Sequence, residues 1–158
     1  MEVLIDSNII LDWFLKRDQF YENSKAVLNK CWFGNIKSFI TIHSLCDIYY
    51  LVGNKFPLEE KKKLIQFLLN RSEIIEENYN SVKAFIDYDF YDDLEDCLQI
   101  QSAQNLRLNY IITRNIKDFR YSTAQAVTPE QFLEMINWIS IFDQSKQNFF
   151  NNLQTDIH

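Results

Sequence analysis

The sequence predicts an α/β fold in which a parallel sheet is sandwiched by helices. Short apolar runs recur along the chain, and each ends in polar residues at which a helical pattern begins. Only 2 Gly and 2 Pro occur among 158 residues, which is too few for the many tight turns of an all-β sandwich. This length and a hydrophobic content of 47% suit a single domain with a substantial core.

Three strands are clear in the sequence and two are weaker. The first is the apolar run Val3 to Ile5, followed by Asp-Ser-Asn, a pattern typical of a buried strand that leads into a helix N-cap. Residues 39–41 repeat this pattern, and residues 110–113 end in Thr-Arg-Asn. Shorter strands are predicted at 73–77 and near 126–127. Because helices separate the strands, the sheet is expected to be parallel.

Helical patterns fill the intervals between these strands. The predicted helices are 8–16, 20–33, 43–52, 58–70, 79–89, 93–107 and 129–138. Pro57 and Pro129 stand at the start of two of them, where proline is tolerated. We therefore predict one domain over 1–138. The polar, Asn- and Gln-rich residues 139–158 are expected to form a C-terminal extension, helical or partly ordered.

Composition indicates which binding partners and which cellular compartment suit this protein. A net charge of −6 and a pI of about 4.9 provide no global attraction for nucleic acid, although a local basic rim could supply it. Cys31, Cys46 and Cys97 are separated and lie in apolar surroundings, so we expect small core residues in a reducing cytoplasm. The apolar window 39–52 is too short to span a membrane, and no signal-peptide pattern opens the chain.

Four carboxylates are expected to meet at one edge of the sheet. Asp6 follows the first strand and Asp118 lies just past the strand 110–113, while Asp47 and Asp96 lie about one turn into their helices. In an open parallel sheet, ligands gather beyond the carboxyl ends of the strands. Each acid alone has a simpler interpretation as a cap, a first-turn acid, a turn residue or an exposed helical position.

The stretch DDLEDCLQ, residues 92–99, contains four carboxylates, each of which could cap a helix or bind a metal. Asp92 and Asp93 are the better candidates for capping the helix, Asp96 is the better candidate for a metal ligand, and Glu95 could serve either role. Convergent carboxylates need a cation to stay ionised together, and hard oxygen ligands select Mg²⁺ or Mn²⁺. Such a site is suited to metal-assisted hydrolysis of phosphodiesters.

Five stretches in order along residues 2–134 carry a family resemblance. They are VLIDSNIILDWFLKR, ITIHSLCDIYYLV, DLEDCLQIQSA, YIITRNIKDF and AVTPEQFL. Together they resemble PIN-domain proteins, in particular the VapC-like toxin ribonucleases of toxin–antitoxin pairs. The resemblance implies a three-layer α/β/α fold with a central parallel sheet of four or five short strands. It also implies an acidic Mg²⁺ site, endoribonuclease activity, inhibition by a protein antitoxin and a possible homodimer.

The family's catalytic acids carry over to four positions. Asp6, Asp96 and Asp118 match its acids and would bind the metal. Asp47 stands where many members have Glu, and its shorter side chain would act directly or through a bridging water. Asn115 matches the polar residue of the strand-end motif.

Further residues are expected to support the site or the substrate. Ser7 and Asn8 resemble the small polar residues after the first Asp and would hydrogen-bond the ligands or the phosphate. Arg114, Lys117 and Arg120 lie near the expected cleft and could hold RNA phosphates. Glu95 is the remaining candidate in the acidic stretch.

The leading hypothesis is therefore a Mg²⁺-dependent endoribonuclease, with Mn²⁺ as a possible substitute. The alternative is a catalytically silent PIN-like module that binds RNA or protein, which the Asp47 departure keeps open. A third hypothesis, a phosphatase or DNA nuclease with the same acids, is separated only by testing substrates. Apolar residues near helices 8–16 and 43–69 could form a groove for an antitoxin helix or a dimer face.

Overall fold

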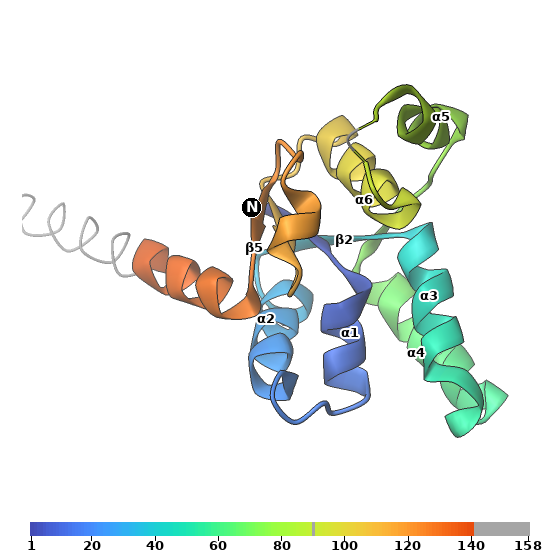
Figure 1. Cartoon of the computed structure of the whole chain (residues 1–158). Coiled ribbons are helices and arrows are strands. Elements are labelled where there is room, and N and C mark those ends of the chain that lie inside the picture. The colour runs from blue at the N-terminus through green and yellow to red at the C-terminus, as the bar shows by residue number, and fades with distance from the viewer. Residues whose placement is uncertain (90, 141–158) are drawn as a thin grey trace, which may run out of the picture.

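The computed structural model describes residues 1–89 and 91–140, and it contains a five-stranded, all-parallel sheet (Figure 1). The order of strands across the sheet is β3-β2-β1-β4-β5. Their bounds are β1 (Glu2–Ile5), β2 (Lys37–Thr41), β3 (Glu73–Ile75), β4 (Tyr110–Ile112) and β5 (Gln125–Val127). The predicted three-layer α/β/α fold with four or five short parallel strands is confirmed, and β3 is shorter than the predicted 73–77.

Helices connect the strands as the sequence predicts. Their bounds are α1 (Ser7–Phe14), α2 (Tyr21–Phe33), α3 (Ile42–Val52), α4 (Leu58–Arg71), α5 (Tyr79–Asp87) and α6 (Leu94–Asn105), with short 3₁₀ turns η1 (Gly53–Lys55) and η2 (Ile116–Phe119). Residues 129–140 are also helical. Of the predicted extension 139–158, all but the first two residues lie outside the described residues. No helix within 1–89 and 91–140 has the length and apolarity needed to cross a membrane.

β1 is the central strand, and its side chains alternate between two cores. Val3 and Ile5 belong to the larger core, whereas Leu4 belongs to the smaller one. This alternation is the two-residue period of a strand whose faces are both buried. In Figure 1, helices α1 to α4 lie on one side of the sheet and α5 and α6 on the other.

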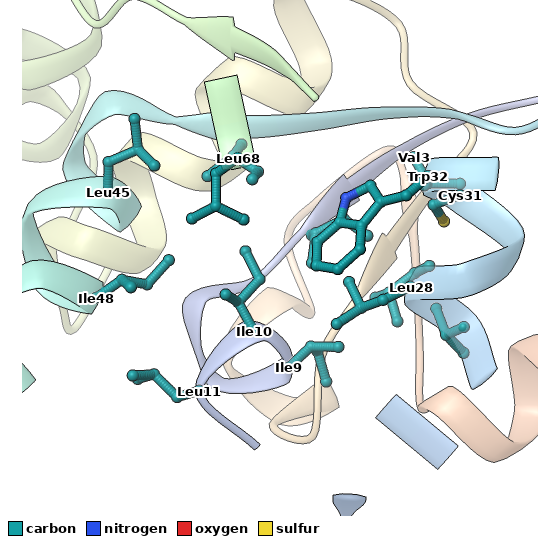
Figure 2. Packing of buried hydrophobic residues seen from close by; sticks show 14 of the residues in the cluster. Val3, Ile9, Ile10, Leu11, Leu28, Cys31, Trp32, Leu45, Ile48 and Leu68 are labelled. Carbon is teal, nitrogen blue, oxygen red and sulfur yellow. The ribbon is translucent and has the colours of Figure 1, made fainter. Parts of the chain in front are cut away.

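The larger core packs α1 and α2 against the sheet. Ile9, Ile10 and Leu28 are fully or almost fully buried there (Figure 2). Burying each such side chain contributes about 1.5–3 kcal/mol of transfer free energy. Trp32 packs edge-on against Trp13 with ring centroids 5.0 Å apart, and its indole N–H donates to Ser72 Oγ over 3.2 Å. The buried indole therefore keeps a hydrogen-bond partner.

The prediction that all three cysteines are core residues is wrong for Cys46. Cys31 and Cys97 are buried, but Cys46 is exposed, and all three thiols are free. On α3 the side chains of Leu45, Ile48 and Val52 face the core at helical spacing, so position 46 falls on the solvent side.

The order of strands determines where a ligand site can form. The chain builds β1, β2 and β3 toward one edge and then returns to place β4 on the other side of β1. This reversal makes the gap beyond the ends of β1 and β4 the topological switch point of the sheet. Asp6 follows β1 and Thr113 follows β4 at this point.

Candidate functional site

Asp6 is the buried centre of the site. Its backbone is the N-cap of α1, but its carboxylate makes no capping hydrogen bond to that helix. Instead Oδ2 accepts hydrogen bonds from the Thr113 hydroxyl over 2.7 Å and from Asn8 Nδ2 over 2.5 Å, and the Ser7 hydroxyl lies 3.4 Å from Oδ1. The neighbouring side chains therefore orient this carboxylate, and it does not cap the helix. Ser7 and Asn8 both contact this acid.

The strand-end motif after β4 holds the same cluster from the other side. The Thr113 hydroxyl accepts hydrogen bonds from the Asn115 N–H over 2.9 Å and from Asn8 Nδ2 over 3.3 Å. Asn8 Oδ1 accepts from the Arg114 N–H over 3.4 Å. The side chain of Asn115 itself is exposed. The two bonds of Asn8 join residues more than 100 positions apart in the sequence.

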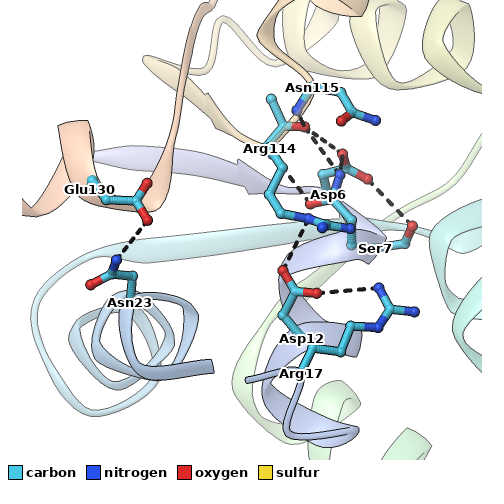
Figure 3. A network of polar contacts seen from close by, with 10 residues as sticks. Asp6, Ser7, Asp12, Arg17, Asn23, Arg114, Asn115 and Glu130 are labelled. Atoms are coloured by element: carbon cyan, nitrogen blue, oxygen red, sulfur yellow. Dashed lines mark hydrogen bonds and ion pairs between the residues drawn. The ribbon is translucent and has the colours of Figure 1, made fainter. Parts of the chain in front are cut away.

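Arg114 points inward in the structure. Its Nε lies 3.1 Å from Oδ2 of Asp12, a fully buried carboxylate that also pairs with Arg17 over 3.2 Å (Figure 3). The guanidinium carbon lies 4.3 Å from the centroid of the Phe20 ring. An uncompensated carboxylate at position 12 would be costly, so both arginines have a structural role there. Burial still raises the pKa of Asp12, against the two arginine charges.

The acidic stretch before α6 divides into capping and site residues. Asp93 is the N-cap, and its side chain accepts from the N–H groups of Glu95 over 2.7 Å and Asp96 over 3.3 Å. Capping by Asp93 is thus confirmed. The prediction that Asp92 caps the helix is wrong, because Asp92 precedes the N-cap and pairs with Arg120 over 3.2 Å. Glu95 and Asp96 are half-buried in the first turn.

Three acids from different segments are close enough to perturb one another. Burial raises the pKa of Asp96 to about 6, and the charges of Asp118 and Asp6 are among the groups that add to this shift. Burial also raises the pKa of Asp6, although hydrogen bonds from Thr113, Asn8 and other neighbours oppose the shift. Asp118 is exposed at η2 and lines a small niche of about 50 Å³ together with Asp96. Asp6, Asp96 and Asp118 therefore form one cluster.

Glu95 connects that cluster to α3. Burial is the largest cause that raises the pKa of Glu95. A hydrogen bond with Asp47 and the charges of Asp47 and Asp6 add to this effect, and the pKa reaches about 8. Two carboxyl groups can share such a hydrogen bond only while one keeps its proton. All four acids expected from the sequence are thus linked around Asp6, with Glu95 as a fifth.

A metal-ligand group that sequence reasoning missed lies at this junction. His43, Asp47 and Glu95 bring one potential ligand atom each within 4.8 Å of one another. His43 Nε2 lies 3.2 Å from Asp47 Oδ2, one helical turn away. The spacing of four residues on a predicted helix was the available signal, since such residues share a face.

Lys117 is exposed on η2, next to Asp118 in the sequence. The expected contacts of Lys117 and Arg114 with RNA phosphates remain predictions. The observed ion pair of Arg114 with Asp12 competes with the contact expected for that residue.

Comparison with known proteins shows the family of this chain. The family model described as PIN domain matches residues 2–117, which is most of the chain. This chain belongs to the PIN-domain family. No sequence among curated proteins matches it significantly.

Solved PIN-fold structures resemble this PIN domain at low sequence identity. One is VapBC2 from Rickettsia felis bound to a promoter DNA fragment, with 19% identity and a TM-score of 0.58 over 81% of this chain and 98% of that one. VapBC-1 from nontypeable Haemophilus influenzae has 18% identity and a TM-score of 0.57, over 82% and 99%. VapC20 of Mycobacterium tuberculosis, described as a toxin that cleaves the sarcin-ricin loop, has 8% identity and a TM-score of 0.57, over 69% and 86%. These similarities establish the shared fold.

The donor atoms of this PIN domain suit a divalent cation. Carboxylate oxygens predominate, as Mg²⁺ and Mn²⁺ prefer, and His43 adds a nitrogen that suits Mn²⁺ better than Mg²⁺. A buried acceptor in the site, Gln99 Oε1, has no hydrogen-bond donor among residues 1–89 and 91–140. Gln99 directs its amide N–H groups to Glu95 over 3.4 Å and to Asp6. An unpaired buried oxygen beside crowded carboxyls is an arrangement that a cation stabilises.

Proposed function

We propose that this protein is a metal-dependent endoribonuclease and the toxin of a toxin–antitoxin pair. The observation that supports this most is the convergence of acids from four segments around the buried Asp6 at the switch point of the sheet. Asp6, Asp96 and Asp118 bind Mg²⁺, for which Mn²⁺ can substitute. Asp47 acts as the fourth catalytic acid, directly or through water.

Each residue has a distinct role in this proposal. A bound cation supplies a water of lowered pKa and neutralises charge that develops on the phosphate. Thr113 and Asn8 keep Asp6 ionised and oriented through their hydrogen bonds. Glu95 holds a proton near neutral pH in the metal-free site and loses it when the cation binds.

The proposed substrate is single-stranded RNA, and the proposed regulator is a protein antitoxin. The structures with a similar fold include VapBC and FitAB complexes, and the VapC20 chain is described as a toxin that cleaves the sarcin-ricin loop. Exposed apolar side chains on α3 and at the start of α4, Ile42, Tyr49, Tyr50, Leu51 and Leu58, provide a surface for an antitoxin helix or for a second copy of the chain.

One observation favours the alternative of a catalytically silent binding module. The short side chain of Asp47 lies 3.2 Å from His43 Nε2, one turn away on the same helix, so its carboxylate already has an imidazole partner. A module of this kind would bind RNA without metal-dependent cleavage.

The deciding experiment is cleavage of end-labelled tRNA, rRNA and mRNA fragments by the purified chain, after mass spectrometry excludes a co-purified inhibitor. The reaction is run with Mg²⁺, with Mn²⁺ and with chelator. Cutting that needs metal and is lost in Asp6→Asn supports the proposal. Asp18→Asn, an exposed acid of the α1–α2 connection, is the matched control. If all three RNA classes stay intact while binding persists, the silent module is the correct function.

A further inference from the structure

A row of tyrosines lies beside the acid cluster and has no place in the proposed chemistry. Tyr91 packs edge-on against Tyr88 on one side and Tyr121 on the other, each with ring centroids 6.4 Å apart. We call Tyr88, Tyr91 and Tyr121 the tyrosine row. It joins the segment between α5 and α6 to the segment after η2.

The tyrosine row borders the acids directly. The niche of about 50 Å³ that is lined by Asp96 and Asp118 is also lined by Tyr91, Arg120 and Tyr121. This volume accommodates a few water-sized ligands. A nucleobase is too large for this volume. A base that binds here would therefore lie across the rim of the niche.

The row is held in place by α6. Gln101 Nε2 donates to the Tyr91 hydroxyl over 3.0 Å, and Gln104 Nε2 donates to the backbone carbonyl of Tyr121 over 3.3 Å. Tyr88 and Tyr121 nevertheless expose 50% and 43% of their surface. The fold therefore fixes the positions of the rings, and a large part of Tyr88 and Tyr121 remains accessible to solvent.

Arg120 adds a cation to this rim. Its guanidinium carbon lies 4.7 Å from the centroid of the Tyr121 ring, and within residues 1–89 and 91–140 it forms an ion pair only with the largely exposed Asp92. Exposed ion pairs of this kind are weak, so the guanidinium can turn to an anion at little cost. A stacked arginine and tyrosine present both a flat face and a positive charge.

We propose that Tyr121 and Arg120, supported by Tyr91, form a subsite for one nucleotide of the RNA strand next to the phosphate that lies at the acids. The base stacks on the aromatic rim, and Arg120 contacts the adjoining phosphate. This inference rests on the proposed function, because it takes RNA as the substrate. Stacking is the appropriate source of affinity here, since a chain of net charge −6 repels RNA as a whole and stacking does not depend on charge.

The test measures binding separately from cleavage. The full-length chain in the Asp6→Asn background is titrated with a single-stranded RNA decamer that carries 2-aminopurine at successive positions, and with a decamer that is abasic at the same positions. Tyr121→Leu is compared with Tyr121→Phe, which retains the ring, and with Tyr79→Leu, a matched change at an exposed tyrosine at the start of α5.

The proposal expects three results. Tyr121→Leu weakens binding of the base-containing RNA about tenfold, as the loss of one stacked base does. Tyr121→Phe and Tyr79→Leu stay within about twofold of the parent, which is the ordinary scatter for surface changes. At one abasic position, the difference between Tyr121→Leu and the parent disappears, which locates the stacked base.

Other outcomes overturn the proposal. Equal affinity of the parent and Tyr121→Leu at every position would exclude the subsite, as would absence of RNA binding by the parent. Unchanged RNA binding together with weaker self-association in sedimentation would assign the row to a protein contact. Should Tyr121→Leu fail to fold by circular dichroism, Arg120→Gln replaces it. That variant must weaken binding and lower its dependence on salt.

Failure of the proposed function gives a different pattern. If the parent with Asp6 intact cuts no RNA but Tyr121→Leu still loses base-dependent binding, the subsite stands and the nuclease proposal fails. If RNA is cut and Tyr121→Leu leaves KM unchanged, the nuclease stands and the subsite fails.

Discussion

The Thr113 hydroxyl, just after β4, donates to Oδ2 of Asp6, just after β1, over 2.7 Å. This hydrogen bond joins the ends of two neighbouring parallel strands at the switch point of the sheet. The same hydroxyl accepts from the Asn115 N–H. One side chain thereby fixes both the central acid and the start of the segment that carries Asp118.

Removal of this hydroxyl by Thr113→Val should weaken the site more than its small change in volume implies. Asp6 loses its shortest hydroxyl partner and the Asn115 N–H loses its acceptor, so we expect about a tenfold or greater loss of Mn²⁺ affinity and about 1–3 kcal/mol of stability. Calorimetric metal titration and urea unfolding measure the two effects. Thr113→Ser retains the hydroxyl and should stay close to the parent. Equal losses in both variants would contradict the role of the hydrogen bond.

The raised pKa values predict an unusual dependence of stability on pH. A carboxyl whose pKa is higher in the folded state stabilises the fold while it is protonated, and this contribution is lost as pH rises through the folded pKa. With Asp96 near 6 and Glu95 near 8, the Tm of the metal-free protein should fall between about pH 4 and pH 8. Saturating Mg²⁺ should reduce or reverse the fall. Glu95→Gln should flatten the upper part of the curve. A Tm that rises in chelator from pH 6 to 8 would contradict this prediction.

The same groups predict that metal binding releases protons. The cation binds deprotonated carboxyls, so metal affinity should increase from about pH 6 to pH 8 as Asp96 and Glu95 are ionised more readily. Calorimetry in two buffers of different ionisation enthalpy gives the number of protons released. Glu95→Gln should release fewer than the parent. Identical heats in the two buffers at pH 7 would count against a protonated Glu95.

His43 should influence which metal is preferred. Its imidazole lies within the group formed with Asp47 and Glu95, and nitrogen ligands favour Mn²⁺ over Mg²⁺. We expect His43→Gln to lower Mn²⁺ affinity several-fold, while Mg²⁺ affinity changes little. Competition between the two metals, followed by electron paramagnetic resonance of free Mn²⁺, measures the ratio. Equal loss for both metals would show that His43 acts only by orienting Asp47.

A core substitution tests the packing on which the site depends. Ile10 is fully buried on α1 between the sheet and its neighbouring helices (Figure 2). Ile10→Ala should cost about 2–5 kcal/mol, because it removes buried methyl groups and leaves a cavity. Ile42→Ala, at an exposed position on α3, should cost about 0.5 kcal/mol or less. Urea unfolding compares the two, and similar costs would contradict the described core.

Local patterns in the sequence were sufficient for the elements of the fold. Apolar runs such as 3–5 and 110–113 end in polar residues where the strands end, because burial and capping act within a few residues. Asp93 was recognisable as a cap for the same reason. The acids at the strand ends could be expected to converge once the sheet was known to be parallel, since this follows from the geometry of any such sheet.

Only the tertiary structure decided which polar side chains around Asp6 contact one another. The sequence did not indicate that Arg114 turns inward to the buried Asp12, or that His43 joins Asp47 and Glu95. Such contacts join segments that are far apart in the chain, and a side chain with several possible partners selects among them only when packing fixes the distances. Cys46 was misjudged for a related reason, because its exposure depends on how α3 rotates its apolar face onto the core. The sequence by itself determined which elements form and which acids lie at their ends, whereas packing determined which charges face one another.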